Sequence, residues 1–202
     1  MQEPALVYII DDDEAILKSL HWLIESDDIK VKAFSDAITF LEQFAPHHPS
    51  CLIADIRMPR MSGLELQDQL LAKNISIPII FISGHANIPM AVSAINKGAL
   101  DFLIKPFNDQ RLLESVNSAL KYDHQSHEKL ELVSQFKERL ATLTTRERQI
   151  YRYMITGCLN KIIAAELGIH IKTVEIHRAH IMQKTQVKSL AELVKLSILS
   201  EQ

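Results

Sequence analysis

Five short apolar segments, each followed by a stretch of helical periodicity, constrain the fold of this 202-residue chain more than any other feature. The apolar segments are residues 6–10, 31–34, 51–55, 78–83 and 101–105. The helical stretches lie near residues 14–26, 36–44, 63–72, 87–97 and 109–122. Strands that alternate with helices form parallel sheets that are buried on both faces. Residues 1–122 are therefore predicted to form an α/β doubly wound, five-stranded parallel sheet.

Polar side chains follow or end four of these predicted strands. They are Asp11, Asp12 and Asp13 after the first strand, Asp55 at the third, Ser83 at the fourth and Lys105 at the fifth. In open α/β sheets, binding sites lie just beyond the carboxyl ends of the strands. One crevice could therefore hold acids, a hydroxyl and an amine.

These residue types suit the chemistry of a phosphoryl group. Carboxylates that lie close together bind Mg²⁺, and the cation offsets their mutual repulsion and neutralises phosphoryl oxygens. Asp55 ends the middle strand and is the best-placed nucleophile, a role that aspartate takes in other phosphoryl transfers. Lys105 would hold phosphoryl oxygens as a point charge, and Ser83 could donate a hydrogen bond. Asp13 is expected to face solvent at the start of the first helix, where a negative charge is favourable.

Residues 4–122 resemble the receiver domain of response regulators, a CheY-like fold, through the segments IIDDDEAI, CLIADIRMPRMSGLEL and PIIFISGHANIPMAVSAINKGALDFLIKPF. Within them, SGHANIPMAV and KGALDFLIKPF are similar to the FixJ branch of the NarL/FixJ family. The resemblance implies that a sensor histidine kinase phosphorylates Asp55. It also implies that Mg²⁺ is bound by Asp12, Asp55 and the backbone carbonyl of Arg57, with Asp11 holding a metal-bound water.

The resemblance assigns further roles around the phosphorylation site. Ser83 and Lys105 would contact the phosphoryl group, and Phe102 matches a switch aromatic that turns inward when Ser83 moves. The bond between Lys105 and Pro106 matches a peptide bond that is usually cis, in keeping with where cis bonds occur.

The fourth helix and the fifth strand match the face through which phosphorylated receivers dimerise. Val92, Asn96 and Asp101 lie on or near this face. The sequence departs from the branch at Ala86 and Asn96, where glycine and lysine are common, so the contacts of this dimer are expected to differ.

The region 123–141 contains no glycine or proline and is predicted to be a helical linker. Leu132, Val133, Phe136 and Leu140 recur at helical spacing. This segment either extends the preceding helix or forms a separate one. It is either a solvated connector or a helix that contacts a partner domain or a second copy.

Residues 142–202 are predicted to form an all-α, four-helix domain with a helix-turn-helix. Thr144 and Glu147 fit a capping box that opens the first helix, and Gly157 fits its end. Asn160 is expected to cap the second helix and Gly168 to end it. The third helix runs to residue 185, and the fourth covers 189–200 behind a Ser189 cap. Residues 1–124 carry a net charge of −7 and residues 141–202 carry +4, so the second domain suits a polyanionic partner.

Residues 142–202 resemble the LuxR-type helix-turn-helix of the same family. On a helical wheel, Val174, Ile181 and Thr185 form one stripe that should pack on the other helices. The opposite face is expected to enter the DNA major groove, and it comprises Lys172, Ile176, Ala179, His180 and Gln183, flanked by Glu175. Ile176 could contact a thymine methyl group and Glu175 a cytosine amino group.

Residues that flank this face are assigned to DNA phosphates. They are Asn160, Lys161, Thr173, His177, Arg178 and Lys184. His177 could instead be a partly buried histidine with its hydrogen bonds satisfied. Leu190, Leu193, Val194 and Ser197 of the last helix are either a dimer contact or part of the core.

We therefore expect a cytoplasmic response regulator rather than an enzyme, with a receiver at 1–122, a linker at 123–141 and a DNA-binding domain at 142–202. Its expected partners are a sensor histidine kinase, promoter DNA, RNA polymerase and, after phosphorylation, a second copy of the chain. No membrane span is expected, because no apolar run approaches 18 residues.

The sequence disfavours three rival functions. A LuxR-type regulator that senses a small molecule would need a ligand domain, which has no place in residues 1–122. A Mg²⁺-dependent phosphatase with an aspartyl nucleophile would need a second acid two residues after Asp55, where Arg57 stands. A DNA-binding protein with a degenerate receiver is disfavoured by the full set of acids, hydroxyl and lysine.

Overall fold

The computed structural model describes residues 4–84 and 88–201. The chain divides into two compact units, residues 1–127 and 128–202, which we describe one at a time. Ala86 lies outside the described residues. Within them, no helix combines the length and the apolarity that a membrane span requires.

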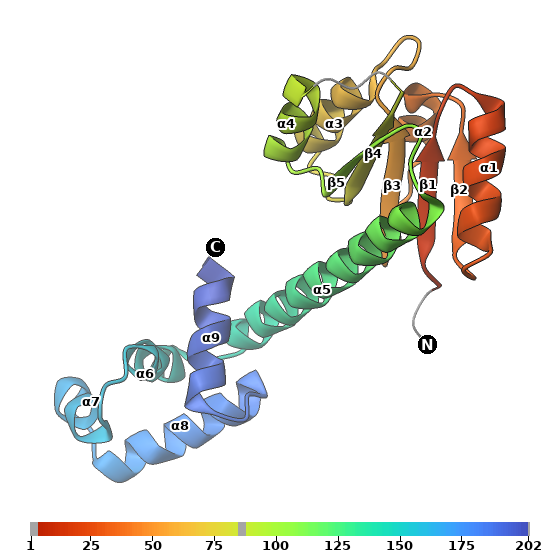
Figure 1. The fold of residues 1–202 in the computed structure, drawn as a ribbon. Helices are drawn as coiled ribbons and strands as arrows, with labels where there is room; N and C mark the ends of the chain where they lie inside the picture. The colour runs from red at the N-terminus through yellow and green to blue at the C-terminus, as the bar shows by residue number, and fades with distance from the viewer. Residues whose placement is uncertain (1–3, 85–87, 202) are drawn as a thin grey trace. The chain divides into compact units, whose positions relative to one another are not determined.

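In the described part of the first unit, five parallel strands form one sheet in the order β2-β1-β3-β4-β5 (Figure 1). Their bounds are β1 (Leu6–Ile10), β2 (Lys30–Phe34), β3 (Ser50–Asp55), β4 (Ile79–Ser83) and β5 (Asp101–Ile104). Each lies within one residue of the predicted segment at either end, and the predicted sheet is confirmed. In register, Ile10 lies opposite Ala54, Asp55 opposite Ile82 and Ser83 opposite Ile104. The polar residues at the strand ends therefore share one edge of the sheet.

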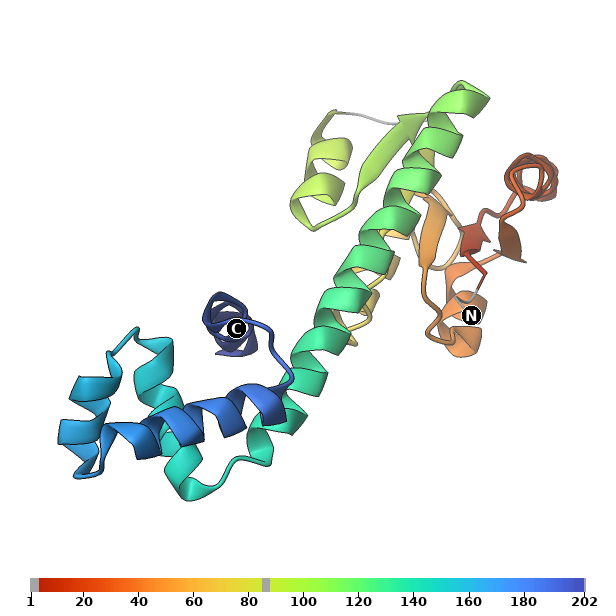
Figure 2. The same ribbon diagram turned by 90° about the horizontal axis from the view of Figure 1, so that it is seen from below.

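Successive strand residues point to opposite sides of the sheet, and apolar side chains lie on both sides. Helices therefore cover both faces. The helices are α1 (Glu14–Glu25), α2 (Ala37–Gln43), α3 (Gly63–Ala72), α4 (Ile88–Asn96) and the start of α5 (Asp109–Ala141). Tyr8 and Ile10 pack in one cluster with α2, α3 and α4. Val7 and Ile9 pack in the other with α1 and α5. Figures 1 and 2 give two views of these layers.

Capping groups fix where the helices begin on the functional edge of the sheet. The Asp13 carboxylate accepts a hydrogen bond from the Ala15 N–H at 2.8 Å, which confirms its expected place at the start of α1. Ser62 and Glu65 form a capping box at α3. At Gly63, an added Cβ would lie 2.4 Å from the Asp55 carbonyl oxygen, so only glycine lets α3 begin this close to β3.

The region between the two expected domains is helical, and it extends α5 rather than forming a separate helix. In the first unit, Leu112 and Val116 of α5 pack against the sheet. In the second unit, Phe136 is buried in the core. Leu132 is 57% exposed, so only part of the predicted apolar stripe is buried.

Four further helices form most of the second unit. They are α6 (Thr145–Ile155), α7 (Asn160–Leu167), α8 (Ile171–Thr185) and α9 (Leu190–Glu201). Their core comprises Phe136, Ile150, Met154, Ile163, Val174, Ile181 and Leu193 together with smaller neighbours. Helix α8 packs on α6 and α7, as Figure 2 shows from below. The predicted four-helix domain is confirmed.

Most of the predicted helix ends are confirmed, with one correction. Thr144 and Glu147 form the expected capping box, and Gly168 closes α7 in the left-handed conformation. Asn160 does not cap α7, because it is the first residue within the helix. The carbonyl of Leu159 accepts the first hydrogen bond, from the Ile163 N–H at 3.1 Å, so the cap position falls on a leucine.

The last helix packs inward through two residues that were candidates for a dimer contact. Ser189 caps α9 as predicted, accepting a hydrogen bond from the Glu192 N–H at 3.1 Å. Leu193 and Ser197 are buried, and the Ser197 hydroxyl lies 2.7 Å from the Tyr151 hydroxyl. The core alternative therefore holds for these two residues.

Candidate functional site

The carboxyl edge of the sheet brings Asp11, Asp55 and Lys105 into direct contact. Asp11 follows β1 and is 1% exposed, and Asp55 is the last residue of β3. The Lys105 amine lies 2.7 Å from Asp11 Oδ2 and 2.9 Å from Asp55 Oδ1. With Asp12, which is exposed and directly follows Asp11, these residues are called the acidic pocket below.

The acidic pocket holds more negative than positive charge. Burial raises the pKa of Asp11 above its ordinary value, and the nearby Asp55 charge acts in the same direction. Hydrogen bonds from Lys105 and from the Asp13 N–H only partly oppose this rise. Burial alone would lower the pKa of Lys105, but its bonds to the two carboxylates outweigh burial and raise it. One ammonium thus faces two carboxylates in a largely buried site, where water screens their charges only weakly.

The donor set of the acidic pocket fits a hard divalent cation. Mg²⁺ favours a few carboxylate and carbonyl oxygens together with water, and such a cation would offset the crowding of Asp11 and Asp55. The Arg57 N–H donates to Asp55 Oδ2 at 2.6 Å, which fixes the backbone beside the acid. The Arg57 side chain is exposed.

The two other residues expected near the phosphoryl group lie on β4 and β5. Ser83 is buried at the end of β4, and its carbonyl accepts the Lys105 N–H at 2.9 Å. Phe102 is half-buried and packs against the core cluster that contains Phe81. The bond between Lys105 and Pro106 is cis, as expected.

The expected dimer face carries exposed apolar side chains and one acid, Asp101, that is hydrogen-bonded to α5. Val92 and Asn96 are exposed on α4. Asp101 is tied to α5, since its Oδ2 lies 2.7 Å from an Arg111 nitrogen and accepts the Ser115 hydroxyl at 2.6 Å. Exposed apolar side chains on α4 and β5 are those of Ile88, Val92, Ile95 and Ile104.

Helix α8 of the second unit has the two faces that the helical wheel predicts. Val174, Ile181 and Thr185 are fully buried. The outward face consists of Lys172, Glu175, Ile176, Ala179, His180 and Gln183, all of them exposed. The residues assigned to phosphates are Asn160, Lys161, Thr173, His177, Arg178 and Lys184, of which Lys161 is exposed and the others are half-buried.

One buried acid, Glu147, joins α6 to α8. Its Oε2 lies 2.6 Å from the Lys184 amine and accepts hydrogen bonds from the Thr144 N–H and hydroxyl. Burial would raise the pKa of Glu147, but these bonds outweigh it and lower the pKa to about 2. The structure therefore brings Lys184 to Glu147, a contact that the sequence analysis did not foresee.

The two units match two protein families in the order seen in the structure. The family "Response regulator receiver domain" matches residues 7–117, and "Bacterial regulatory proteins, luxR family" matches residues 141–197. Transcriptional regulatory protein FixJ of Azorhizobium caulinodans is 38% identical over 200 residues, covering 99% of this chain and 95% of FixJ. The chain is a response regulator of the NarL/FixJ family. It is a two-component regulator of transcription, with a receiver domain and a LuxR-type DNA-binding domain.

Similar proteins are regulators of the same architecture. Response regulator protein TmoT of Ectopseudomonas mendocina is 44% identical over 195 residues, covering 96% of this chain and 89% of TmoT. The solved structure of the response regulator StyR is 43% identical, with a TM-score of 0.82 and coverage of 97% and 99%. Full-length FixJ from B. japonicum is 36% identical, with a TM-score of 0.59 and coverage of 100% and 98%.

Proposed function

We propose that Asp55 accepts a phosphoryl group from a histidine of a sensor kinase, and that this modification controls DNA binding. The observation that carries the proposal is the position of Asp55. It ends the central strand with its carboxylate held by Lys105 beside the buried Asp11. In this function, residues 1–122 act as the receiver, 123–141 as a helical linker and 142–202 as the DNA-binding domain.

In the proposed reaction, a carboxylate oxygen of Asp55 attacks the phosphorus atom of the phosphohistidine. The phosphorus–nitrogen bond breaks, the kinase histidine leaves with the electron pair, and an acyl phosphate forms on Asp55. Lys105 then donates to a phosphoryl oxygen, and Ser83 donates a second hydrogen bond. Asp12, Asp55 and the Arg57 carbonyl would hold Mg²⁺, with Asp11 placed to bind its water, and the bound cation neutralises phosphoryl charge.

The new interactions are strong enough to shift a two-state equilibrium. A phosphoryl group adds about −1.5 to −2 charges. Shifting a population from 1:99 to 99:1 requires about 5.5 kcal/mol, and charge-assisted hydrogen bonds contribute about 1.5–3 kcal/mol each. Bonds to Ser83 and Lys105 are thus of the required size. Phe102 turns inward in response, and the face with Val92, Asn96 and Asp101 dimerises.

The dimer then presents two copies of α8 to successive half-sites of promoter DNA, where the bound regulator acts on RNA polymerase. A single domain with a net charge of +4 binds weakly and with strong salt dependence. Two copies one helical turn apart raise the affinity and set the spacing of the half-sites. The exposed face with Lys172, Glu175 and Ile176 meets the bases, while Lys161 and its neighbours meet phosphates.

Labelling with acetyl phosphate and Mg²⁺ tests the assignment of Asp55. The wild-type chain should gain one phosphoryl group, measured by intact mass, and Asp55→Asn should gain none. If the receiver were degenerate, the wild-type chain would remain unlabelled. Equal labelling of wild type and Asp55→Asn would place the modification on another residue.

A further inference from the structure

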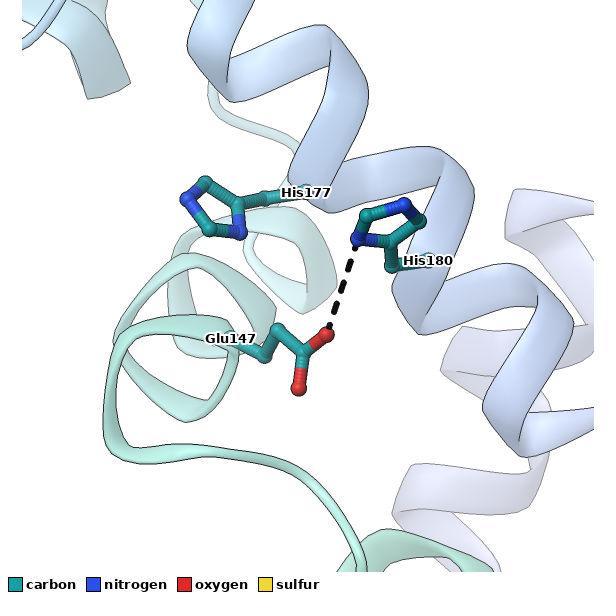
Figure 3. Close-up of side chains that lie close together, drawn as sticks. All are labelled: Glu147, His177 and His180. Carbon is teal, nitrogen blue, oxygen red and sulfur yellow. Dashed lines mark ion pairs between the residues drawn. The ribbon is translucent and has the colours of Figure 1, made fainter.

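Three metal-ligating side chains meet where α6 contacts α8, outside the acidic pocket. Glu147 comes from α6, and His177 and His180 come from α8 (Figure 3). One ligand atom of each lies within 4.8 Å of the other two. His180 Nδ1 is 4.0 Å from Glu147 Oε1. The two histidines stand three positions apart, so they project from the same side of the helix.

A buried ring nitrogen of His177 lacks a hydrogen-bond partner among the described residues. This atom is Nδ1, and Figure 3 shows it on the side of the ring that faces Glu147 and His180. A buried polar atom without a protein partner is unfavourable, so a water molecule, a ligand or an ion is expected to satisfy it. An ion pair between His180 and Glu147 would explain their closeness but would leave His177 Nδ1 without a partner.

The two oxygens of the Glu147 carboxylate lie in different environments. Oε2 is occupied by Thr144 and by the Lys184 amine at 2.6 Å. Oε1 is the oxygen nearer His180. The contact with Lys184 therefore leaves one oxygen directed at the histidine pair, although the ammonium weakens the attraction for any cation bound there.

We propose that Glu147, His177 and His180 bind one divalent transition-metal ion of the Zn²⁺ class. Two imidazoles and one carboxylate suit Zn²⁺, whereas Mg²⁺ and Ca²⁺ favour oxygen ligands. Zinc–nitrogen bonds of about 2.0–2.1 Å place tetrahedral ligands about 3.4 Å apart, so the side chains must close in slightly. The His180 side chain is 54% exposed and has room to make this movement. The fourth position is left to water.

A bound ion would connect α6 to the helix that we assign to DNA. His177 and His180 both belong to the proposed DNA surface, so the ion would use side chains that otherwise meet the duplex. Metal binding is measured without DNA and without phosphorylation. Its failure is therefore distinguishable from failure of the proposed function.

The test is a calorimetric Zn²⁺ titration of the untagged full-length chain carrying Asp55→Asn, which weakens metal binding at the acidic pocket. We expect one Zn²⁺ per chain at the new site, and at least tenfold weaker binding in His180→Gln and in His177→Gln. His21→Gln is the matched control, because His21 also lies beside a carboxylate, that of Glu25, at 3.2 Å. It should bind Zn²⁺ like the parent. Equal binding in the parent and in His180→Gln would overturn the proposal.

Thermal unfolding gives a second measurement that does not rely on substitution of the half-buried His177. Zn²⁺ should raise the melting temperature of the Asp55→Asn chain, and the rise should be lost in His180→Gln, whose exposed side chain can change without disturbing the core. An equal rise in both proteins would contradict the site. Co²⁺ absorption bands of a nitrogen-ligated ion, present in the parent and absent from His180→Gln, would support it.

Discussion

Each unit of the chain contains a lysine that bonds to a carboxylate far away in sequence. In the receiver, Lys105 bonds to Asp11 and Asp55 at 2.7 and 2.9 Å. In the DNA-binding unit, Lys184 bonds to Glu147 at 2.6 Å. The contacts are alike in chemistry and in length, but the pKa of Asp11 is raised and the pKa of Glu147 is lowered.

The difference lies in the balance between burial, which raises the pKa of either acid, and the bonds that lower it. Lys105 is shared by two acids, and burial raises the pKa of Asp11. Glu147 has Lys184 to itself and two further bonds from Thr144, and its pKa falls to about 2. A carboxylate with enough partners stays ionised and stabilises the fold, and in Glu147 its second oxygen is still directed at His180. Crowded carboxylates are suited to bind a cation or to react.

The largest expected effect distinguishes Asp12, in the acidic pocket, from its neighbour Asp13, which lies outside it. Asp12→Ala should abolish Mg²⁺-dependent phosphorylation, because it removes a proposed metal ligand. Asp13→Ala should leave phosphorylation nearly intact and cost about 1 kcal/mol of stability, since Asp13 caps α1. Intact-mass labelling and chemical denaturation measure the two effects. Loss of labelling in both variants would contradict the division of roles.

Removal of Lys105 should destabilise the receiver, because its ammonium offsets the repulsion between Asp11 and Asp55. Lys105→Met leaves two buried carboxylates without their ammonium, so the free energy of unfolding should fall by about 3 kcal/mol in metal-free buffer. Adding Mg²⁺ should recover part of this loss, because the cation takes over the neutralisation. Urea denaturation with and without Mg²⁺ provides the comparison. Unchanged stability, or no response to Mg²⁺, would count against a crowded pocket.

The equivalent change in the second unit should be smaller and should depend on pH. Glu147→Gln should lower the free energy of unfolding by about 2 kcal/mol at pH 7, measured with EDTA present. The pKa of Glu147 falls from 4.5 to about 2 on folding. The wild-type advantage is therefore complete above the unfolded pKa and shrinks as the pH drops toward about 2. If the stability difference between wild type and Glu147→Gln grew as the pH fell, the lowered pKa of Glu147 would be contradicted.

The smallest effect concerns the two lysines assigned to phosphates. Lys161 is exposed, so Lys161→Ala should reduce the slope of log affinity against log salt by about 0.9, the value for one phosphate contact. Lys184→Met should reduce it less, because the amine is held by Glu147. Fluorescence anisotropy over a salt series measures both slopes. A larger change for Lys184→Met would mean that Lys184 leaves Glu147 to meet DNA.

The alternation of apolar strands and helices was enough to predict the sheet, because continuous apolar strands separated by helices indicate a parallel sheet buried on both faces. The place of Asp13 and the capping box at Thr144 also followed from local sequence, since caps act over a few residues. The acidic pocket could be listed in advance because parallel strands end at one edge. The acids that Lys105 contacts could not be predicted, because such contacts depend on side-chain conformation.

Features that depend on distant packing were missed. Asn160 has a side chain suited to a cap, but α7 begins one residue earlier than expected, so the cap position falls on Leu159. Lys184 and Glu147 are 37 residues apart, and the sequence offered a complete local role for each, as a phosphate contact and a helix cap. The cluster of Glu147, His177 and His180 gave no signal, because its ligands come from two helices.

The central claim is that phosphorylation of Asp55 controls DNA binding. The direct test is anisotropy of the full-length chain on DNA selected from a random pool by the phosphorylated protein. Wild type treated with acetyl phosphate and Mg²⁺ should bind at least tenfold more tightly than untreated protein, and Asp55→Asn should bind weakly with or without treatment. If Asp55→Asn bound this DNA as tightly as phosphorylated wild type, the account would be contradicted.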